Sequence, residues 1–436
     1  MLTLPEAALQ NGEITGAQLS ALLTRHAEAL PRYARLRSYY LNQNDILSRT
    51  RAPGLPNHRV PHAFARYIVL VTSGYLVGES VGYKTDDENR KALDALLSCY
   101  READIPSVDI ENARNAAIYG KGVELVTSQG GRPRSYALSP ENAFVVYSDS
   151  IAHEPLLGVC LCQAESGQDA QALCFTKDSV LDFALINGTW TLRSRQPHYM
   201  GGVPMVEFWN DEREMGDFEW VIPLIDAYDA LQSDRINDKD QFADKLLVLT
   251  GCTLDTDESG RPPWLQLRQD RALCLPDSDA SAQYLSGEMN EAGNEILRSS
   301  LASDIHKLSL VPDLSDKSFS GNVSGVAMKY KLMGLEMLCG LKQQWFTEGL
   351  KARLRLYAHY LALTGQTPLD PSRVTPSFTR ALPESLTETA ELIKTAGEAG
   401  AMSTRTMVET LHKNADWDET MIQRELTSLT TPPNKL

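Results

Sequence analysis

A run of about 40 residues in the second half of the chain, Ser324–Leu363, does most to limit how this sequence can fold. Apolar residues recur along it at helical spacing, and a single helix of that length is roughly 60 Å long. Four glycines within it should permit a bend: Gly325, Gly334, Gly340 and Gly349. A helix this long can hardly bury a wide apolar face alone in a chain of this size, which favours an assembly of several copies.

The apolar side chains of this run cover more than one narrow stripe. They are Tyr330, Met333, Met337, Leu341, Trp345, Leu350, Leu354, Tyr357 and Leu361. Burial in the chain's own core is one interpretation. We favour contact between the subunits of a closed ring, because one helix can hardly bury so wide a face alone. The expected interface residues are Tyr330, Met337, Leu341 and Trp345.

A second long periodic segment, Ile222–Leu249, predicts a helix of about 28 residues with an acidic face. Pro223 suits its first turn, where no backbone N–H is needed, and Gly251 is a suitable C-terminal cap. The candidate functional acids on it are Asp226, Asp229, Asp234, Asp238 and Asp240. These carboxylates either line a passage or point outward, and the sequence leaves both readings open.

The rest of the chain predicts an α+β protein made of several parts. Helical spacing dominates to about residue 110, and a mixed, mostly antiparallel β region is expected over residues 112–210, with turns at Gly130–Gly131 and Gly201–Gly202. The later segments are expected to be a turn-rich excursion (252–286), a helix (Gly287–Lys307), a polar loop (Ser309–Asn322), the long helix, one strand near Pro376, and two or three helices ending near Ser428.

The charge balance limits the partners of the chain. Its 436 residues include 57 Asp and Glu against 42 Lys and Arg, which gives a net charge of −15. Tight binding of nucleic acid needs a dense basic face, so this balance argues against gripping DNA but not against letting it slide past. Seven cysteines, an odd number, indicate reduced thiols. With no secretory signal and no uninterrupted apolar span, we expect a soluble intracellular protein.

Motifs for catalysis or metal binding are weak. Residues 120–122 (Gly-Lys-Gly) lack the spacing and the hydroxyl of a phosphate-binding loop. The turn that begins at Asp255 is similar to the start of a calcium loop, but Gln266 stands where a bidentate glutamate is required. Cys160 and Cys162 have no second pair at zinc spacing. We therefore expect no enzyme, no metal site and no cofactor.

Several phrases, in their order along the chain, carry a specific resemblance. They are YYLNQNDILSR (Tyr39–Arg49), SGYLVGESVGY (Ser73–Tyr83), ARNAAIYGKGVELV (Ala113–Val126), LSPENAFVVYSDS (Leu138–Ser150), LIDAYDALQSDRINDKDQFADKLLVLTG (Leu224–Gly251) and VPDLSDKSFSGNVSGVAMKYKLMGLE (Val311–Glu336). Over nearly its whole length the chain resembles the portal (connector) proteins of tailed bacteriophages, of the type found in long-tailed phages of Gram-positive hosts.

The resemblance implies a multi-domain, ring-forming portal fold with a mixed α/β wing, a helical stem, a small clip, a long bent spine helix and a helical crown. The implied boundaries are 1–221 for the N-terminal part of the wing, 222–250 for the first stem helix, 251–286 for the clip, 287–308 for the second stem helix, 309–322 for a tunnel loop, 323–365 for the spine helix, 366–383 for a wing strand and 384–436 for the crown.

The resemblance also implies a ring of about twelve copies at one capsid vertex. Double-stranded DNA would enter through its channel during packaging and leave through it during ejection. The implied partners are the terminase large subunit, a head-completion (adaptor) protein, and the scaffolding and major capsid proteins, with no membrane. The ring would nucleate procapsid assembly, and it would be found in the host cytoplasm during assembly and then in the virion.

Residue roles follow from this scheme as expectations. An acidic stem would let DNA move through the channel, because acidic walls offer no position that binds its phosphates tightly. The tunnel loop would face DNA through Asp313, Asp316, Lys317 and Phe319, with Lys317 as the phosphate partner. The clip would offer Trp264, Leu265 and Leu267 as interface anchors, because aromatic residues concentrate at interfaces. A local cluster is the alternative for the clip residues, and a plain flexible loop is the alternative for the tunnel loop.

Two other functions compete with the DNA conduit. One is a structural ring whose pore does not carry DNA. The other is an enzyme such as a nuclease, which would need carboxylates clustered around a metal. The acidic residues of this chain are instead spread along helices, which disfavours the enzyme.

Overall fold

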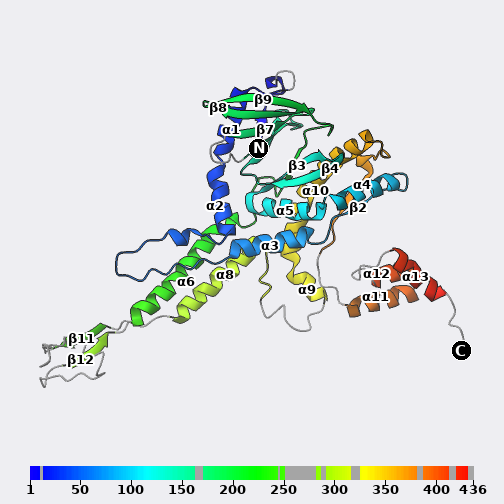
Figure 1. Ribbon diagram of the computed structural model, residues 1–436. Coiled ribbons are helices and arrows are strands. Elements are labelled where there is room, and N and C mark those ends of the chain that lie inside the picture. Colours follow the sequence, from blue (N-terminus) through cyan, green and yellow to red (C-terminus); the bar gives the residue numbers. More distant parts are fainter. Residues whose placement is uncertain are drawn as a thin grey trace. The chain divides into compact units, whose positions relative to one another are not determined.

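The computed structural model describes residues 1–9, 13–162, 170–243, 246–250, 281–285, 291–315, 325–380, 386–411 and 419–430. The chain divides into two compact units, each assembled from separated stretches of sequence. The first unit contains Met1–Leu36, Tyr67–Glu219 and Ser309–Leu436, and the second contains Arg37–Arg66 and Trp220–Leu308. Helices and several sheets are both present (Figure 1), so the predicted α+β class is confirmed.

A six-stranded sheet forms one part of the first unit. Its order is β1 (Leu2–Leu4), β5 (Ala143–Ser148), β6 (Pro155–Cys162), β7 (Gln171–Phe175), β8 (Ser179–Ile186) and β9 (Thr189–Pro197). Neighbouring strands are antiparallel except β1 and β5. Strand β5 is buried on both faces: Phe144 and Val146 pack with Leu19 of α1 (Gly16–Ala27), while Ala143 and Val145 belong to a second core. The predicted antiparallel β region is thus confirmed.

That second core includes Val123 and Met205, from a three-stranded sheet of order β10 (Met205–Trp209), β3 (Lys121–Gln129) and β4 (Arg132–Leu138). The predicted turn joins β3 to β4, and Gly130 and Gly131 have φ angles of 61° and 76°. The β region begins later than predicted, because helix α5 (Ile105–Tyr119) continues past residue 112. Helix α5 ends at Gly120, whose φ of 92° few other residues adopt.

The other helices of the N-terminal half are α2 (Leu30–Tyr40), α3 (Phe64–Val77) and α4 (Arg90–Glu102). The short strand β2 (Gly82–Lys84) follows α3 and pairs antiparallel with β13 (Thr375–Ser377). The strand predicted near Pro376 is therefore confirmed, and it is held by a strand that lies almost 300 residues earlier in the chain.

The long helical run is present but interrupted. It consists of α9 (Gly325–Lys331) and α10 (Met333–Leu363), which meet at Leu332, where the backbone leaves the helix with φ −90° and ψ 1°. The break lies beside Gly334, in keeping with the bend predicted from the glycines. Three helices, α11 (Leu386–Glu398), α12 (Thr404–Leu411) and α13 (Glu419–Thr430), follow near the C-terminus as predicted.

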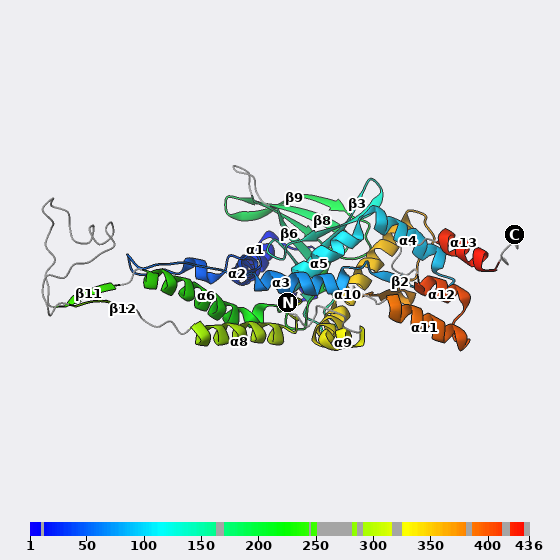
Figure 2. The ribbon, with the colours of Figure 1, turned by 90° about the horizontal axis from the view of Figure 1, so that it is seen from below.

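The second unit contains the acidic helix α6 (Ile222–Ala243) and helix α8 (Glu291–Ser309), which lie side by side (Figure 2). Helix α6 is shorter than the predicted 28 residues, because Leu246–Thr250 forms strand β11 and pairs antiparallel with β12 (Ser281–Leu285). The β-branched residues of this stretch favour a strand when a partner strand is available. The predicted cap Gly251 lies outside the described residues.

Candidate functional site

A segment between α2 and α3, residues 41–63, runs along α6 (Figure 1), and we call it the strap. Its central contact is Asp229 of α6, whose side chain is fully buried. The Asp229 carboxylate accepts a hydrogen bond from the Asn44 side-chain amide at 2.6 Å. It also accepts from the backbone and ring nitrogens of His62, at 2.9 and 2.8 Å. A buried carboxylate needs such partners, so Asp229 holds the strap in place.

Two neutral side chains extend this contact along the same face of α6. The Ser233 hydroxyl accepts from the backbone N–H of Val60 at 3.1 Å, and the Asn237 amide oxygen accepts from the backbone N–H of His58 at 2.6 Å. Ser233 and Asn237 are fully buried, like Asp229. Residues four apart share one helix face, so the strap covers that face of α6.

Most of the other predicted acids of α6 are also paired within the chain. Asp238 is partly exposed and pairs with no other residue in the described part of the chain. The other three acids are paired: Asp226 with Tyr39, Asp234 with Arg49 and Arg51, and Asp240 with His58. The sequence predicted an acidic face, and the strap brings arginine and histidine side chains onto it. Asp229 cannot line a channel, because it is covered completely.

A different face of α6 pairs with α8. The Arg235 guanidinium contacts Glu291 at 2.9 Å and Glu295 at 3.2 Å. Arg298 of α8 donates to the Tyr228 hydroxyl at 3.4 Å. The strap and α8 therefore occupy two faces of α6, and the face that carries Asp234 and Asp238 lies between them around the helix.

The predicted interface residues of the long helix are exposed. Met333, Met337, Leu341 and Trp345 follow one another at intervals of four residues, so they form one apolar stripe on α10. Leu341 and Met337 are each 63% exposed, and Tyr330 of α9 is 73% exposed. Trp345, at 40% exposure, stacks on Trp209 of β10 with 6.3 Å between ring centroids. Of the nine apolar positions, the last four (Leu350, Leu354, Tyr357 and Leu361) are instead buried in the chain's own core.

Two basic residues of the long helix, Lys342 and Arg353, pair with acids of the same chain and anchor the buried side of α10. Arg353 is fully buried and contacts Asp109 of α5 at 2.7 Å and Glu124 of β3 at 3.1 Å. Burial raises the pKa of both carboxyl groups, and the nearby guanidinium opposes that rise. Lys342, also buried, contacts Asp217. The spacing of Lys342 and Arg353 with the buried apolar residues is the sequence signal that could have revealed them.

The predicted tunnel loop and clip are described only in part. Asp313 caps a short turn, since its carboxylate accepts from the backbone N–H of Ser315 at 2.9 Å and from its hydroxyl at 2.6 Å. The other predicted loop residues, Asp316, Lys317 and Phe319, lie outside the described residues, as do the predicted clip anchors Trp264, Leu265 and Leu267.

Two other features are absent from the described ranges. No group of three or more His, Cys, Asp and Glu side chains is arranged to hold a metal ion. None of the helices in these ranges is both long and apolar enough to cross a membrane.

Comparison with known proteins identifies the class. A family model matches residues 19–427, almost the whole chain, and it is a model of phage portal proteins. The matched family is described as "Phage portal protein, SPP1 Gp6-like", and the chain belongs to it. The resemblance seen in the sequence is therefore confirmed.

Two relatives are similar over most of their length. The portal protein of Bacillus phage SPP1 is 25% identical over 407 residues, which are 85% of this chain and 78% of the relative. The portal protein of Clostridium phage phiCD119 is 22% identical over 413 residues, which are 86% and 88% of the two chains. Portal proteins are non-enzymatic components of the virion that take part in DNA packaging, so the expectation that this chain is not an enzyme is confirmed.

Proposed function

We propose that about twelve copies of this chain close into a ring at one capsid vertex and form the channel through which double-stranded DNA enters and leaves. The match to the portal family over residues 19–427 is the observation that carries this proposal. The ring would serve as the docking platform for the terminase large subunit and a head-completion protein. It would also contact the scaffolding and major capsid proteins and nucleate the procapsid.

The parts of the chain receive roles in this proposal. The wing up to residue 221 includes parts of both units, since Arg37–Arg66 belong to the second, and the first unit supplies the spine helix (α9 and α10), the wing strand and the crown. The second unit supplies the stem, with α6 and α8 as its two helices. The clip would be residues 251–286, and Trp264, Leu265 and Leu267 would anchor a partner or a neighbouring subunit there.

The apolar stripe of α10 supports assembly between copies. Water-exposed side chains as large as Tyr330, Met337, Leu341 and Trp345 are costly when they form a continuous row, and burial against a second copy removes that cost. A heterologous contact of this kind, repeated around an axis, closes a ring. We therefore assign the stripe to the contact between neighbouring subunits.

Electron microscopy of the purified protein tests the ring directly. The native chain should give closed rings with an axial opening wide enough for a DNA duplex. Leu341→Glu should reduce the fraction of rings, because it places a charge in the apolar stripe. Leu192→Glu is the matched control, since Leu192 on β9 is an exposed leucine outside the stripe. A native protein that stays monomeric under all conditions would contradict the proposal, as would rings that Leu341→Glu leaves intact.

The free face of α6 is our candidate for the channel wall. The strap covers one face and α8 a second, and Asp234 on the face between them is paired with Arg49 and Arg51 of the strap, so we assign Asp238 to the channel wall. Asp238→Lys should slow packaging, most clearly at low salt, because a cation on the wall attracts phosphate. Glu212→Lys, an equally large charge change on an exposed loop, should not. Equal packaging rates for the native chain and Asp238→Lys would remove Asp238 from the wall.

The tunnel loop retains its predicted role as a proposal. Lys317 would be the loose phosphate contact, with Asp313, Asp316 and Phe319 around it. Lys317→Ala in a packaging assay should lower packaging efficiency or DNA retention, and unchanged values of both would eliminate this role.

A further inference from the structure

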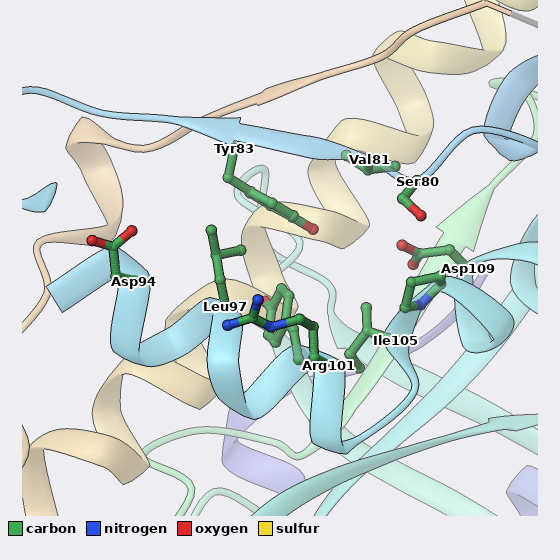
Figure 3. Close-up of a pocket in the computed structure, with 10 residues that line it drawn as sticks. Ser80, Val81, Tyr83, Asp94, Leu97, Arg101, Ile105 and Asp109 are labelled. Carbon is green, nitrogen blue, oxygen red and sulfur yellow. The ribbon is translucent and has the colours of Figure 1, made fainter. Parts of the chain in front are cut away.

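A cavity of about 490 Å³ lies in the first unit between β2, α4 and the start of α5 (Figure 3). Its walls are largely apolar and include Val81, Leu97, Ile105 and Pro106. Polar side chains occur at Ser80, at Asp94 and Arg101 of α4, and at Asp109 of α5. An apolar cavity with a few polar groups is the usual form of a small-ligand site.

The carboxylate of Asp109 is the main charged group that the cavity offers. Figure 3 shows it directed toward Ser80 and Val81, at one end of the cavity. Asp109 is only 3% exposed. Its Oδ1 atom accepts from Arg353 at 2.7 Å, while no donor in the described residues reaches Oδ2. One oxygen of a buried carboxylate is therefore available to a ligand.

The charges around Asp109 do not balance. Among the described residues, Arg353 is the one cation in contact with both Asp109 and Glu124, and all three side chains are buried. Glu124 receives one more hydrogen bond, from the neutral amide of Asn112 at 2.7 Å. Two carboxylates and one guanidinium leave one negative charge. A buried unbalanced charge is costly, so it must be met by a proton or by another cation.

The cavity provides room for that cation beside Asp109 and not beside Glu124, which does not line it. Tyr83, another lining residue, accepts from Arg353 at 3.2 Å through its hydroxyl, and its ring can contact a cation or a hydrocarbon chain. The titratable and charged groups that surround Asp109 are Asp94, Tyr100 and Arg101 of α4, Tyr83 of β2, Glu124 of β3 and Arg353 of α10.

We propose that this cavity binds an aliphatic ammonium ion, with the charged nitrogen on Asp109 and the hydrocarbon chain against the apolar walls. A chain of about four or five carbons suits a cavity of this size. A free amine or diamine and a lysine side chain share this chemistry. Anions are excluded from the Asp109 end of the site, because a carboxylate stands there and the Arg353 donors nearest to it are engaged with Asp109 and Tyr83, while the cation Arg101 lines another part of the cavity.

Isothermal titration of the full-length chain tests the site. The probes are n-butylamine, 1,5-diaminopentane and Nα-acetyl-lysine N-methylamide, with n-butanol as the neutral probe of similar size. The best amine should bind at least about tenfold more tightly than the alcohol, because a hydrogen bond to a charged group is stronger than a neutral one. Preference for the free amines identifies a small-molecule site, and preference for the lysine derivative identifies a peptide side chain as the ligand.

The pH dependence of amine binding shows whether the ammonium ion and a proton compete for Asp109. Because burial raises the pKa of Asp109, protons compete with the ligand as the pH falls toward that pKa. The aliphatic amine stays charged at neutral and acidic pH, so its affinity should fall as the solution is acidified. Affinity that rises on acidification, or alcohol that binds as tightly as amine, would overturn the proposal.

Two variants locate the ligand. Asp109→Asn should abolish the preference for amine over alcohol, and Leu97→Trp should weaken every probe by filling the cavity while leaving the buried charges untouched. Glu111→Gln is the control, because Glu111 is an exposed carboxylate on the same helix as Asp109 and does not line the cavity. Circular dichroism shows whether each variant is folded. If Asp109→Asn and Leu97→Trp both fold and both bind butylamine like the native chain, the site is wrong.

Discussion

At the scale of single residues, Arg353 joins α10 to three consecutive elements that lie far from it in the sequence. From α10 it reaches Asp109 on α5 and Glu124 on β3, and its guanidinium lies 5.3 Å from the ring centre of Tyr100 on α4. A buried ion pair is no proof of net stability, but removal of one partner leaves the others uncompensated. Replacement of Arg353 by an uncharged residue should therefore destabilise the folded chain.

Arg353→Met should lower the free energy of unfolding by about 3–5 kcal/mol, because it leaves two buried carboxylates without their cation. Arg355→Met in the same helix is the control. Arg355 is exposed, and its replacement should change stability by less than about 0.5 kcal/mol. Chemical denaturation of the two variants checks this, and equal losses would contradict a special role for Arg353.

His26 gives the first unit a pH-dependent stability. It stacks on Phe144 with 4.4 Å between ring centroids, and its Nε2–H donates to the Glu141 carbonyl at 3.1 Å. Burial lowers the pKa of His26 below the ordinary value of 6.5, and the hydrogen bond to Glu141 opposes this change. Below pH 6.5 the unfolded chain gains a proton that the folded chain does not, so protonation favours unfolding.

The contribution of His26 to stability is thus complete above pH 6.5 and is lost as the pH falls below that value. His26→Gln, which cannot take up the proton, should make the free energy of unfolding change less between pH 7.5 and 5.5. Denaturation curves at both pH values provide the measurement. Identical slopes for the native chain and the variant would show that His26 does not contribute.

At the scale of elements, α10 has two glycines in contrasting surroundings. A Cβ atom at Gly349 would lie 2.6 Å from the Phe208 ring of β10, so helix and sheet approach closely there. A Cβ atom at Gly340 would meet nothing within 4 Å. The first glycine is required by packing, while the second only makes the helix more flexible.

Gly349→Ala should therefore destabilise the chain by about 1–3 kcal/mol through overpacking. Gly340→Ala should stabilise it by up to about 1 kcal/mol, because alanine favours the helix and restricts the unfolded chain. Thermal unfolding of the two variants measures both effects in the same helix. Changes of the same sign would contradict the difference in packing.

Local signals predicted much of the element order. Glycine turns marked the β3–β4 hairpin, and apolar periodicity marked α10 and the terminal helices. The same signals overextended α6, because the stretch after Ala243 becomes a strand only through its pairing with β12, which lies beyond residues 251–280. They also gave no hint of the strap, since Asn44 and His62 meet Asp229 across 185 and 167 residues. Periodicity identifies a buried face, but it does not identify the distant residue that covers it.

At the scale of the whole molecule, net charge and exposed apolar surface have opposite effects on the association of copies. Each copy carries a charge of −15, so copies repel one another, while the stripe of α10 favours association. Salt weakens the repulsion between exposed charges, since the Debye length falls from about 30 Å at 0.01 M to about 3 Å at 1 M. It does not weaken apolar contacts in the same way.

The fraction of chain in rings should therefore increase as the salt concentration increases from 0.05 to 0.5 M. Analytical ultracentrifugation across this range, at one protein concentration, measures that fraction. Rings that dissociate as salt is added would mean that ion pairs between subunits, rather than the apolar stripe, hold the assembly together.

The strap has a consequence for synthesis on the ribosome. Asn44 is made 185 residues before Asp229, and at 5–20 residues per second the delay is roughly 10–40 s. Throughout that time the basic residues Arg49 and Arg51 have no acidic helix to bind. A nascent chain cannot complete the second unit until α6 has emerged, and translation products that stop before Asp229 should be the first that cellular proteases remove.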